Sequence, residues 1–529
     1  MTEPAQIPDQ AAREAAATTF DRNVVVIAGA GTGKTTLLVN RLLYLLMRRT
    51  DPLALSRIVA LTFTNKAATE MKLRLRERLR SLVNVEGRDN PAAGSGTVSI
   101  ADLRMRYGWT TDEIVARADA ALRDVEKAQI GTLHSFAAHL LRLYPIEAGV
   151  TPTFQTDEDG SRFEEHFTSE WELWLDRELG AAGSDHGRWR ILLDTFSLDE
   201  LRELAYSLHS DLIDLNGLME QVAETGLNPG LRDWFSIRKA QAERLLGRYD
   251  RPKRRKIELM LAAVAELFAL LLAEGLGAVR SFSGESQELL AEDLGAAPTG
   301  WEEDDYEAVE SLQRIAKRLL RVDHELLQNL LALLAPFVQS VRKSFLDSGW
   351  LTFDGLVGKA RTLLRDHPPI REQLKRDYRA LLVDEFQDTD PVQYEIVLYL
   401  AERPGTQAGS WRETELESGK LFIVGDPKQS IYAFRRADIE AFDHVVDRLE
   451  GSGALRCELA TNFRSHAQVL DLVNGVFNRL LVAQPAIQPP NVPLTVQPNR
   501  SSQFRNPGVE LRLVASEDDG DLDSAAATR

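Results

Sequence analysis

The chain has 529 residues, of which 44% are hydrophobic and 27% are charged, proportions typical of a soluble globular protein rather than of a membrane or fibrous one. Its length exceeds what one hydrophobic core organises, so about two to four domains are expected. Lys and Arg total 63 against 80 Asp and Glu, a net charge of -17. This charge argues against a uniformly basic nucleic-acid binder, but it is compatible with a local basic groove.

Cys457 is the only cysteine, which excludes an intramolecular disulfide, a Cys-ligated cluster and a Cys-rich zinc site. The first residues, MTEPAQIPDQ, are polar and acidic and do not resemble a signal peptide. The most apolar segment, which starts at Leu259, is interrupted by Glu266 and is too short to span a bilayer. We therefore expect a cytoplasmic protein that does not associate with membranes.

Residues 20 to 80 contain two apolar runs, VVVIA and IVALTFT, each followed by a helical pattern of hydrophobic residues. This order of elements predicts a βαβα unit and hence a parallel sheet. Residues 86 to 108 are rich in Gly, Asn, Pro and Ser, so we expect a loop insertion there.

The first predicted strand leads into IAGAGTGKTT, residues 27 to 36, and a helical run follows at once. In a loop of this kind the backbone N–H groups surround phosphate oxygens, Lys34 adds positive charge, and the Thr35 hydroxyl can ligate Mg²⁺. The strict pattern has glycine where this chain has Ala28, although the remaining glycines keep the loop permissive. The alternative is a glycine-rich turn without a ligand. The predicted contacts to ATP are Ala28, Gly29, Ala30, Gly31, Thr32, Gly33, Lys34, Thr35 and Thr36.

From about residue 157 to 350 the pattern is almost wholly helical, with aromatic residues at helical spacing from Phe163 to Trp174. We expect a separate α-helical domain inserted between strands of the sheet. The sheet then resumes with ALLVDEF and LFIVGD. A last apolar run, ALRCELA, precedes a helix that starts at about His466, and Pro, Gln and Asn dominate beyond residue 480.

A phosphate-binding loop of this type needs an acidic partner at the end of another strand, and LLVDEFQD supplies one. Asp384 would hold Mg²⁺, while Glu385 would orient and deprotonate the attacking water. The alternative interpretation is a solvated acidic loop.

Seven features together resemble the UvrD/RecB/AddA-type helicases of superfamily one. They are Gln10, AGAGTGKTT, LTFTNKAATEM, GTLHSFAAHLLR, VDEFQDTDPVQ, GDPKQSIYAFRRADI and LATNFRS, in the order of the family and across residues 10 to 465. The sequences of VDEFQDTDPVQ and GDPKQSIYAFRRADI are more similar to the RecB/AddA branch than to the UvrD/Rep branch. The long separation between His134 and Asp384 favours the same branch.

The resemblance implies further roles at the nucleotide. Gln10 would contact the nucleotide, Phe463 would stack on adenine, and Gln429 would sense the γ-phosphate. Arg464 would reach that phosphate from a second motor domain, so that hydrolysis depends on closure of a cleft. Alternatively, Gln10 could be a surface residue, the segment around Gln429 could be a simple strand-end turn, and Arg464 could form a salt bridge at the start of a helix. The implied catalytic residues are Lys34, Asp384, Glu385, Gln429 and Arg464.

The resemblance also implies contacts to single-stranded DNA. Rings just beyond Gln429 would stack on bases and couple hydrolysis to the grip on DNA, since stacking tolerates any sequence. The alternatives are aromatics that pack inward and, for His134, a packed or capping histidine. The implied DNA-binding residues are Phe63, Thr64, Asn65, Thr132, His134, Tyr432, Phe434 and Arg435.

Two other basic features carry less information. Arg314, Lys317, Arg318 and Arg321 fall on one helical face, and RPKRRK covers residues 251 to 256. Either could touch the backbone of incoming duplex, but a charged stripe is more often a solvated face.

We therefore expect an α/β fold, with a RecA-like P-loop sheet, a large inserted helical domain and the start of a second RecA-like domain. The expected parts are residues 1–150, 151–350, 351–450 and 451–529, of which the first and third form the first RecA-like domain. The expected function is ATP-dependent movement on DNA in repair or recombination, with ATP and Mg²⁺ as cofactors. Expected partners are single-stranded DNA and duplex junctions, and a nuclease or a second helicase polypeptide is a further candidate. The alternatives are an ATP-gated single-strand-binding protein and a P-loop ATPase acting on something other than DNA.

In the family that this chain resembles, a second motor domain with further motifs closes the cleft. One of these motifs resembles TxHxxKGLE, and another contributes a further arginine to the γ-phosphate. Residues 465 to 529 contain neither of them. They contain one helix, a Pro-rich connector, the strand-like VELRLV and an acidic tail. We expect an N-terminal part of a longer protein, which binds nucleotide but does not unwind DNA processively.

Overall fold

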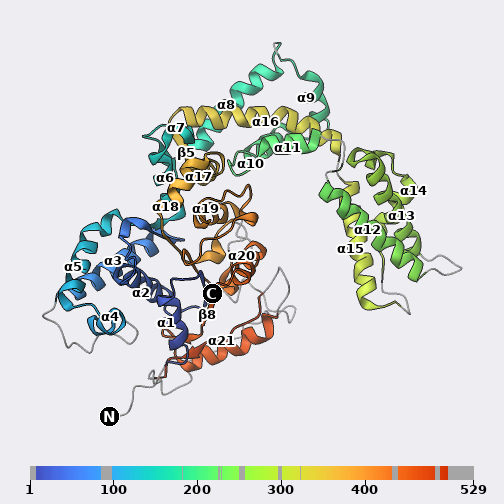
Figure 1. Cartoon of the computed structure of the whole chain (residues 1–529). Helices are drawn as coiled ribbons and strands as arrows, with labels where there is room; N and C mark the ends of the chain where they lie inside the picture. The colour runs from blue at the N-terminus through green and yellow to red at the C-terminus, as the bar shows by residue number, and fades with distance from the viewer. Residues whose placement is uncertain are drawn as a thin grey trace, which may run out of the picture. The chain divides into compact units, whose positions relative to one another are not determined.

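The computed structural model describes residues 7–84, 98–181, 183–223, 227, 229–249, 256–295, 301–321, 323–431, 439–482 and 489–498. The chain divides into two compact units, shown in Figure 1. The first unit combines Met1–Thr153 with Leu356–Arg529, and the second is Phe154–Gly355.

The first unit is built on a six-stranded parallel sheet in the order β3–β2–β6–β7–β1–β8. The strands are β1 (Val24–Ala28), β2 (Ile58–Thr62), β3 (Gln129–Thr132), β6 (Ala380–Val383), β7 (Leu421–Gly425) and β8 (Leu455–Leu459). Every residue of β1, β2, β6 and β7 is buried, as expected for parallel strands that are covered on both faces. This confirms the predicted α/β class with its parallel sheet.

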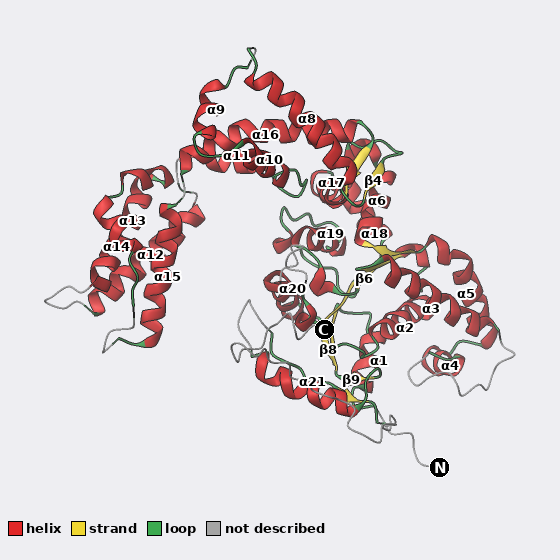
Figure 2. Cartoon of the chain, turned by 180° about the vertical axis from the view of Figure 1, so that it is seen from behind, coloured by secondary structure: helices red, strands yellow, loops and turns green. Residues whose placement is uncertain are grey.

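Helices cover both faces of this sheet. Strand residues such as Val26 and Phe422 share one hydrophobic core with the helices on one face. Those helices are α1 (Gln10–Thr18), α2 (Lys34–Met47), α3 (Asn65–Val83) and α5 (Thr111–Asp124). Figures 1 and 2 show α19 (Pro391–Ala401) and α20 (Ile439–Gly451) on the other side of the sheet. Because α2 is apolar on most of its surface, it is buried from Leu37 to Met47 except at Asn40, and it provides a rigid base for the loop before it.

Two expectations about this unit need correction. Residues 86 to 108 are not wholly a loop, because α4 (Ile100–Tyr107) is a helix, and residues 85–97 lie outside the described part. A capping box between Ser99 and Asp102 starts this helix, which the surrounding Gly and Pro residues obscured. The boundary expected at residue 451 is also too early, since β8 pairs in parallel with β1 and belongs to the main sheet.

The second unit is almost entirely helical, as Figure 2 shows by colour, which confirms the predicted helical insertion. One core joins α8 (Ser161–Leu179), α9 (His186–Leu193), α10 (Leu198–Ser207), α11 (Leu215–Ala223) and α16 (His324–Asp347). Another joins α12 (Pro229–Arg248), α13 (Lys256–Glu274), α14 (Gly284–Ala291) and α15 (Glu303–Leu320). A short parallel pair, β4 (Gln155–Asp157) and β5 (Trp350–Thr352), ties the two ends of the unit together.

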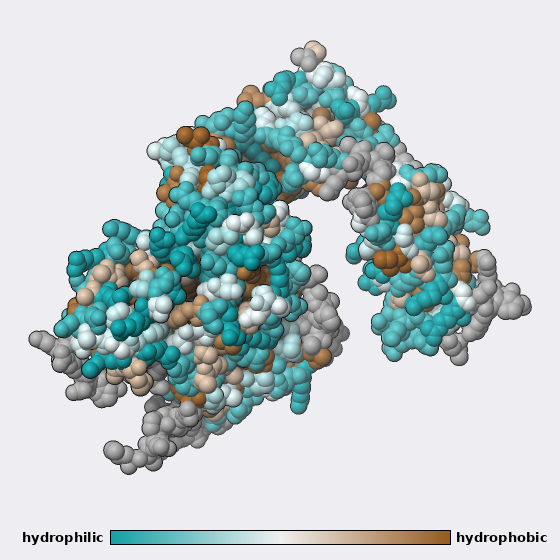
Figure 3. All heavy atoms as spheres, viewed as in Figure 1, coloured by the Kyte–Doolittle hydropathy of each residue, from teal (hydrophilic) through white to brown (hydrophobic). Residues whose placement is uncertain are grey.

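The apolar segment from Leu259 is the middle of α13 and is packed in the second of these cores. Within the described ranges, none of the helices combines the length and the apolar character that a bilayer crossing requires. Hydrophilic residues make up most of the face seen in Figure 3.

After β8 the first unit continues with β9 (Thr461–Asn462), which pairs in parallel with β10 (Thr495–Val496). Between them lies α21 (Ala467–Leu480), which confirms the helix predicted from about His466. VELRLV and the acidic tail lie outside the described residues. The remaining helices are α6 (Leu133–Leu143), α7 (Pro145–Ala148), α17 (Phe353–Asp366) and α18 (Pro368–Asp377).

Candidate active site

Six of the sequence motifs follow the carboxyl ends of the six strands of one sheet. The glycine-rich loop follows β1, DEFQD follows β6, and GDPKQ follows β7. TFTN follows β2, GTLHS ends β3, and TNFRS follows β8. Because all six strands are parallel, these segments lie along the same edge of the sheet, where open α/β sheets bind their ligands.

The glycine-rich loop adopts a conformation that depends on its glycines. Gly31 and Gly33 have φ angles of 73° and 86°, in the left-handed region that side chains disfavour. Thr32 is fully buried, and its hydroxyl donates to the carbonyl of Gly29 at 2.8 Å, which closes the loop. Lys34 is the first residue of α2, so the loop delivers it to the amino end of a buried helix. This is the geometry of an anion site at a helix N-terminus.

Lys34 and Glu385 form an ion pair across the site. The Lys34 Nζ lies 2.7 Å from the Glu385 Oε2, with 11% and 31% of the two side chains exposed. Glu385 itself has φ 51° and ψ 46°, a left-handed conformation that is rare for a non-glycine residue. The two groups predicted to act on a phosphate and on water are therefore in direct contact.

Two aspartates flank this pair. Asp384 is 8% exposed and accepts the backbone N–H of Glu385 at 3.1 Å. Burial, helped by the charge of Glu385, raises the pKa of Asp384 to about 6. Burial and the same neighbour raise the pKa of Asp388 to about 6, although sequence reasoning gave Asp388 no role. A buried carboxylate at a strand end next to a phosphate loop is a suitable donor for Mg²⁺.

We expect Asp384→Asn to stabilise the folded chain. Because the folded pKa of Asp384 lies above its ordinary value of 3.8, its stabilising contribution is complete below about pH 3.8 and is lost as pH rises through about 6. Asparagine carries no charge, so the variant should gain up to about 3 kcal/mol of unfolding free energy at pH 7.5. Denaturation curves from pH 5 to 8 should show this gain shrinking towards pH 5. A gain that does not change with pH, or one matched by the exposed control Asp377→Asn, would contradict the assignment.

Gln387 connects two strand ends and was missed as an individual residue by sequence reasoning. It is 1% exposed, and its Nε2 donates to Glu385 Oε2 at 2.9 Å. Its Oε1 accepts the backbone N–H of Asp426 at 2.9 Å, and the Asp426 carboxylate in turn accepts from Gln429 Nε2 at 2.7 Å. A side chain at Gly425 would place its Cβ 2.9 Å from that same amide oxygen. A hydrogen-bonded route therefore runs from Gln429 to Glu385.

Residues 460–464, called segment 460–464 below, lie against the glycine-rich loop. Asn462 donates to the carbonyl of Ala30 at 2.7 Å, and the backbone N–H of Phe463 donates to Gly31 at 2.8 Å. A Cβ on Gly31 would come within 2.8 Å of the Arg464 Cβ. Arg464 itself is exposed. The backbone of Arg464, the arginine predicted to reach the γ-phosphate, therefore lies directly beside the loop that would hold the phosphates.

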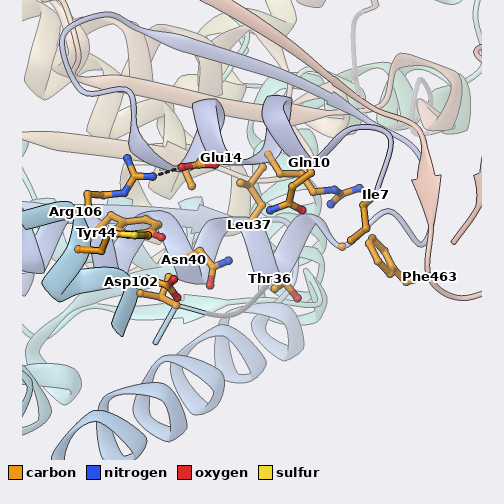
Figure 4. A pocket seen from close by; sticks show the side chains of 15 residues that line it. Ile7, Gln10, Glu14, Thr36, Leu37, Asn40, Tyr44, Asp102, Arg106 and Phe463 are labelled. Atoms are coloured by element: carbon orange, nitrogen blue, oxygen red, sulfur yellow. Dashed lines mark hydrogen bonds and ion pairs between the residues drawn. The ribbon is translucent and has the colours of Figure 1, made fainter. Parts of the chain in front are cut away.

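Next to this segment lies a pocket of about 440 Å³. Figure 4 shows Gln10 and Glu14 of α1 facing Thr36, Asn40 and Tyr44 of α2 across it. Phe463 stands at one end, and Asp102 and Arg106 of α4 stand at the other. The pocket thus brings Gln10 and Phe463, both predicted to contact the nucleotide, to the end of the glycine-rich loop.

The predicted DNA-binding residues that the structure describes lie at the ends of β2 and β3. Phe63, Thr64 and Asn65 follow β2, and the Thr64 hydroxyl caps α3. Thr132 is buried, and its hydroxyl caps α6, while His134 is partly buried in the first turn of that helix. Tyr432, Phe434 and Arg435 fall outside the described residues.

The two weaker basic features are in the second unit. Arg314, Lys317 and Arg318 lie on α15, and Lys317 donates to the carbonyl of Glu292 at 3.3 Å. Arg321 is exposed directly after this helix. Of residues 251 to 256 only Lys256 is described, and it pairs with Glu292 at 2.8 Å.

A comparison with protein families matches residues 9–449 to the UvrD/REP helicase N-terminal domain. The chain belongs to the UvrD/REP helicase family. The matched range contains all of the site described above except segment 460–464, and it confirms the resemblance read from the motifs. The UvrD/REP match also agrees with the predicted RecA-like sheet and its helical insertion.

The relatives of this UvrD/REP family member include proteins whose name describes one subunit of an ATP-dependent helicase/nuclease. The one from Geobacillus thermodenitrificans is 27% identical over 517 residues, which cover 87% of this chain and 38% of the relative. The one from Bacillus anthracis is 28% identical, with the same two coverages. The chain thus spans between a third and two fifths of the length of these relatives, and their name agrees with the RecB/AddA branch.

Proposed function

We propose that this chain is an ATP-hydrolysing part of a DNA helicase or translocase that acts in repair or recombination. The observation that carries the proposal is the junction at the sheet edge, where Lys34 meets Glu385 at 2.7 Å beside a glycine-rich loop. The family supplies the reaction class, since its members are helicases.

The proposed chemistry is hydrolysis of the γ-phosphate of ATP. The loop from Gly29 to Gly33 would surround the phosphates with backbone N–H groups, and Lys34 would leave Glu385 to neutralise them. Thr35 and Asp384 would hold Mg²⁺, which when bound supplies charge to the phosphate oxygens. Glu385, released from Lys34, would take the proton of the attacking water. Arg464 would complete the charge around the transferred phosphoryl group.

The pocket beside α1 is proposed as the base site. Phe463 offers a ring for stacking, Gln10 offers an amide for the base edge, and both line the same pocket next to Gly33 and Thr36. Stacking on one ring with polar groups at the edge is the usual arrangement of small-molecule pockets.

Coupling to DNA is proposed to pass through the end of β7. Gln429 is joined to Glu385 by the hydrogen bonds through Asp426 and Gln387. Residues 432–438 follow directly and contain the rings assigned to DNA. A change at the phosphate would therefore be transmitted to the strand grip over a short path, with Phe63, Asn65 and His134 supplying neighbouring DNA contacts.

We expect Gln429→Ala to uncouple the two activities. The variant should bind ATP and single-stranded DNA, while the stimulation of hydrolysis by DNA falls about tenfold, the effect of losing about 1.4 kcal/mol of coupling. Phosphate release titrated with an oligonucleotide measures this, and Gln393→Ala on α19 serves as control. Normal stimulation together with altered adenine selectivity would remove the sensor role.

Two measurements separate the proposal from its alternatives. Strand displacement, with ATP present, distinguishes a helicase from an ATP-gated single-strand-binding protein. A rate of phosphate release that does not change when DNA is added would favour an ATPase acting on another substrate. The relatives' name also motivates a second polypeptide as partner, which co-purification of the full-length protein would test.

A further inference from the structure

Asp9 stands at the amino end of α1 but does not cap it. Aspartate at this position usually accepts the backbone N–H groups of its own helix, and here no such bond is formed. Instead, Asp9 Oδ2 accepts the backbone N–H groups of Ala460 and Thr461, each at 3.0 Å. The carboxylate is therefore used to hold a segment that is distant in sequence.

Arg13, one turn further along α1, binds the same carboxylate with two hydrogen bonds, both 2.8 Å long. Its Nη1 donates to the carbonyl of Thr32 in the glycine-rich loop at 2.6 Å, and its Nη2 donates to the carbonyl of Thr461 at 3.3 Å. Its guanidinium also lies 4.9 Å from the centre of the Phe463 ring. One side chain thus touches the helix, the phosphate loop and segment 460–464.

The pair is partly buried and sits on a fixed element. The side chains of Arg13 and Asp9 are 14% and 10% exposed, so both are largely shielded from water. Although burial raises the pKa of Asp9, the hydrogen bonds from Arg13 and Thr461 lower it below its ordinary value. The other end of α1 is anchored by the buried Arg41, which donates to the carbonyl of Ala16 at 2.6 Å.

We propose that Asp9 and Arg13 are positioning residues, which hold segment 460–464 against the glycine-rich loop and so place Phe463 at the base and Arg464 at the γ-phosphate. This inference rests on the proposed function. A purely structural pair would stabilise α1 alone, whereas this pair bonds to four backbone groups, on Thr32, Ala460 and Thr461, that belong to the two segments proposed to face the nucleotide. Arg13 also lines the base pocket, so a bound base touches the residue that fixes Arg464.

A double-mutant cycle tests whether Asp9 acts through Arg464. In the unaltered background, Asp9→Asn should lower kcat for ATP hydrolysis by about 10-fold to 100-fold, the cost of a lost charged hydrogen-bond partner. In an Arg464→Ala background, the same substitution should lower kcat by less than about twofold, because the group being positioned is gone. Arg13→Lys keeps the charge but cannot form both hydrogen bonds to the Asp9 carboxylate, so it should show the same difference in kcat loss between the two backgrounds. It replaces Asp9→Asn in the cycle if that variant folds poorly.

Amide exchange of the nucleotide-free protein gives a second readout that does not depend on hydrolysis. Asp9→Asn should increase exchange at Ala460 and Thr461 by about tenfold or more, since their N–H groups lose a charged acceptor. Glu450→Gln removes one charged partner of Arg456 on β8, the strand that precedes Ala460, and should leave both rates unchanged.

Equal losses of kcat in both backgrounds, or unchanged exchange at Ala460 and Thr461, would overturn the inference. Measuring Lys34→Ala in parallel shows whether the proposed ATP hydrolysis itself, rather than the positioning role, is wrong. If hydrolysis by the unaltered chain does not depend on Lys34, the proposed function is wrong and the catalytic part of the inference falls with it. If Lys34 is essential and the cycle is additive, only the positioning role is wrong.

Discussion

Lys34→Ala should abolish ATP hydrolysis, with a loss of at least about a thousandfold. Lys34 is the only cation that the glycine-rich loop itself contributes, and its side chain is 11% exposed at the amino end of α2. Removing it takes away the positive charge that phosphoryl transfer needs at the β and γ positions. It also leaves Glu385 beside Asp384 and Asp388 without the Lys34 charge, which offsets part of the rise in pKa that burial and Glu385 cause at both aspartates. Nucleotide affinity should therefore fall together with the rate.

Equilibrium binding of a fluorescent ATP analogue and steady-state phosphate release measure the two effects. Lys343→Ala, a lysine on α16 in the second unit, is the matched control and should behave like the unaltered chain. Hydrolysis by Lys34→Ala at more than about a tenth of the normal rate would mean that the phosphates are bound elsewhere.

Glu385→Gln should separate binding from turnover. Loss of a general base lowers the rate by about 10² to 10⁴. The substitution also removes the charge that holds Lys34 at 2.7 Å. Because Lys34 no longer has to leave an ion pair, affinity for ATP should be retained or rise a few fold. The hydrogen bond from Gln387 does not require a charged acceptor, since an amide oxygen can accept it, so the local geometry should persist.

Rapid-quench measurement of a single turnover distinguishes a slow chemical step from slow product release. Glu458→Gln, an exposed glutamate on β8, provides the control. A normal single-turnover rate in Glu385→Gln would assign the base to another group, for which Asp388, whose raised pKa reflects burial and the charge of Glu385, is a candidate.

Local patterns predicted most of the fold because each strand and helix has its own signal. VVVIA followed by a glycine-rich loop predicted β1 and α2, and the aromatic spacing from Phe163 predicted α8. The predictions failed at α4, where the Gly- and Pro-rich composition hid a helix start, and at β8, where strand pairing decides which sheet the strand joins. Ser99 and Asp102 start a helix inside a Gly- and Pro-rich stretch, and β8 joins the main sheet because it can pair with β1.

The candidate site was predicted where a motif carries its own chemistry, as at Lys34 and Glu385, which the fold brings into contact over 351 positions. The residues that hold the motifs together were not predicted. Arg13 reaches Thr461 over 448 positions, and Gln387 reaches Asp426 over 39, with no periodic pattern that links them. An aspartate and an arginine one turn apart suggest only an ordinary helix ion pair until the fold places segment 460–464 beside them.

Phosphate release by the purified chain, with and without single-stranded DNA, tests the central claim most directly. The account predicts ATP hydrolysis that single-stranded DNA stimulates and that Glu385→Gln abolishes in both conditions. Glu385, the proposed base, lies at the end of β6 along the same sheet edge as the motifs proposed to bind DNA. Hydrolysis that DNA leaves unchanged, or that survives Glu385→Gln at the normal rate, would contradict it.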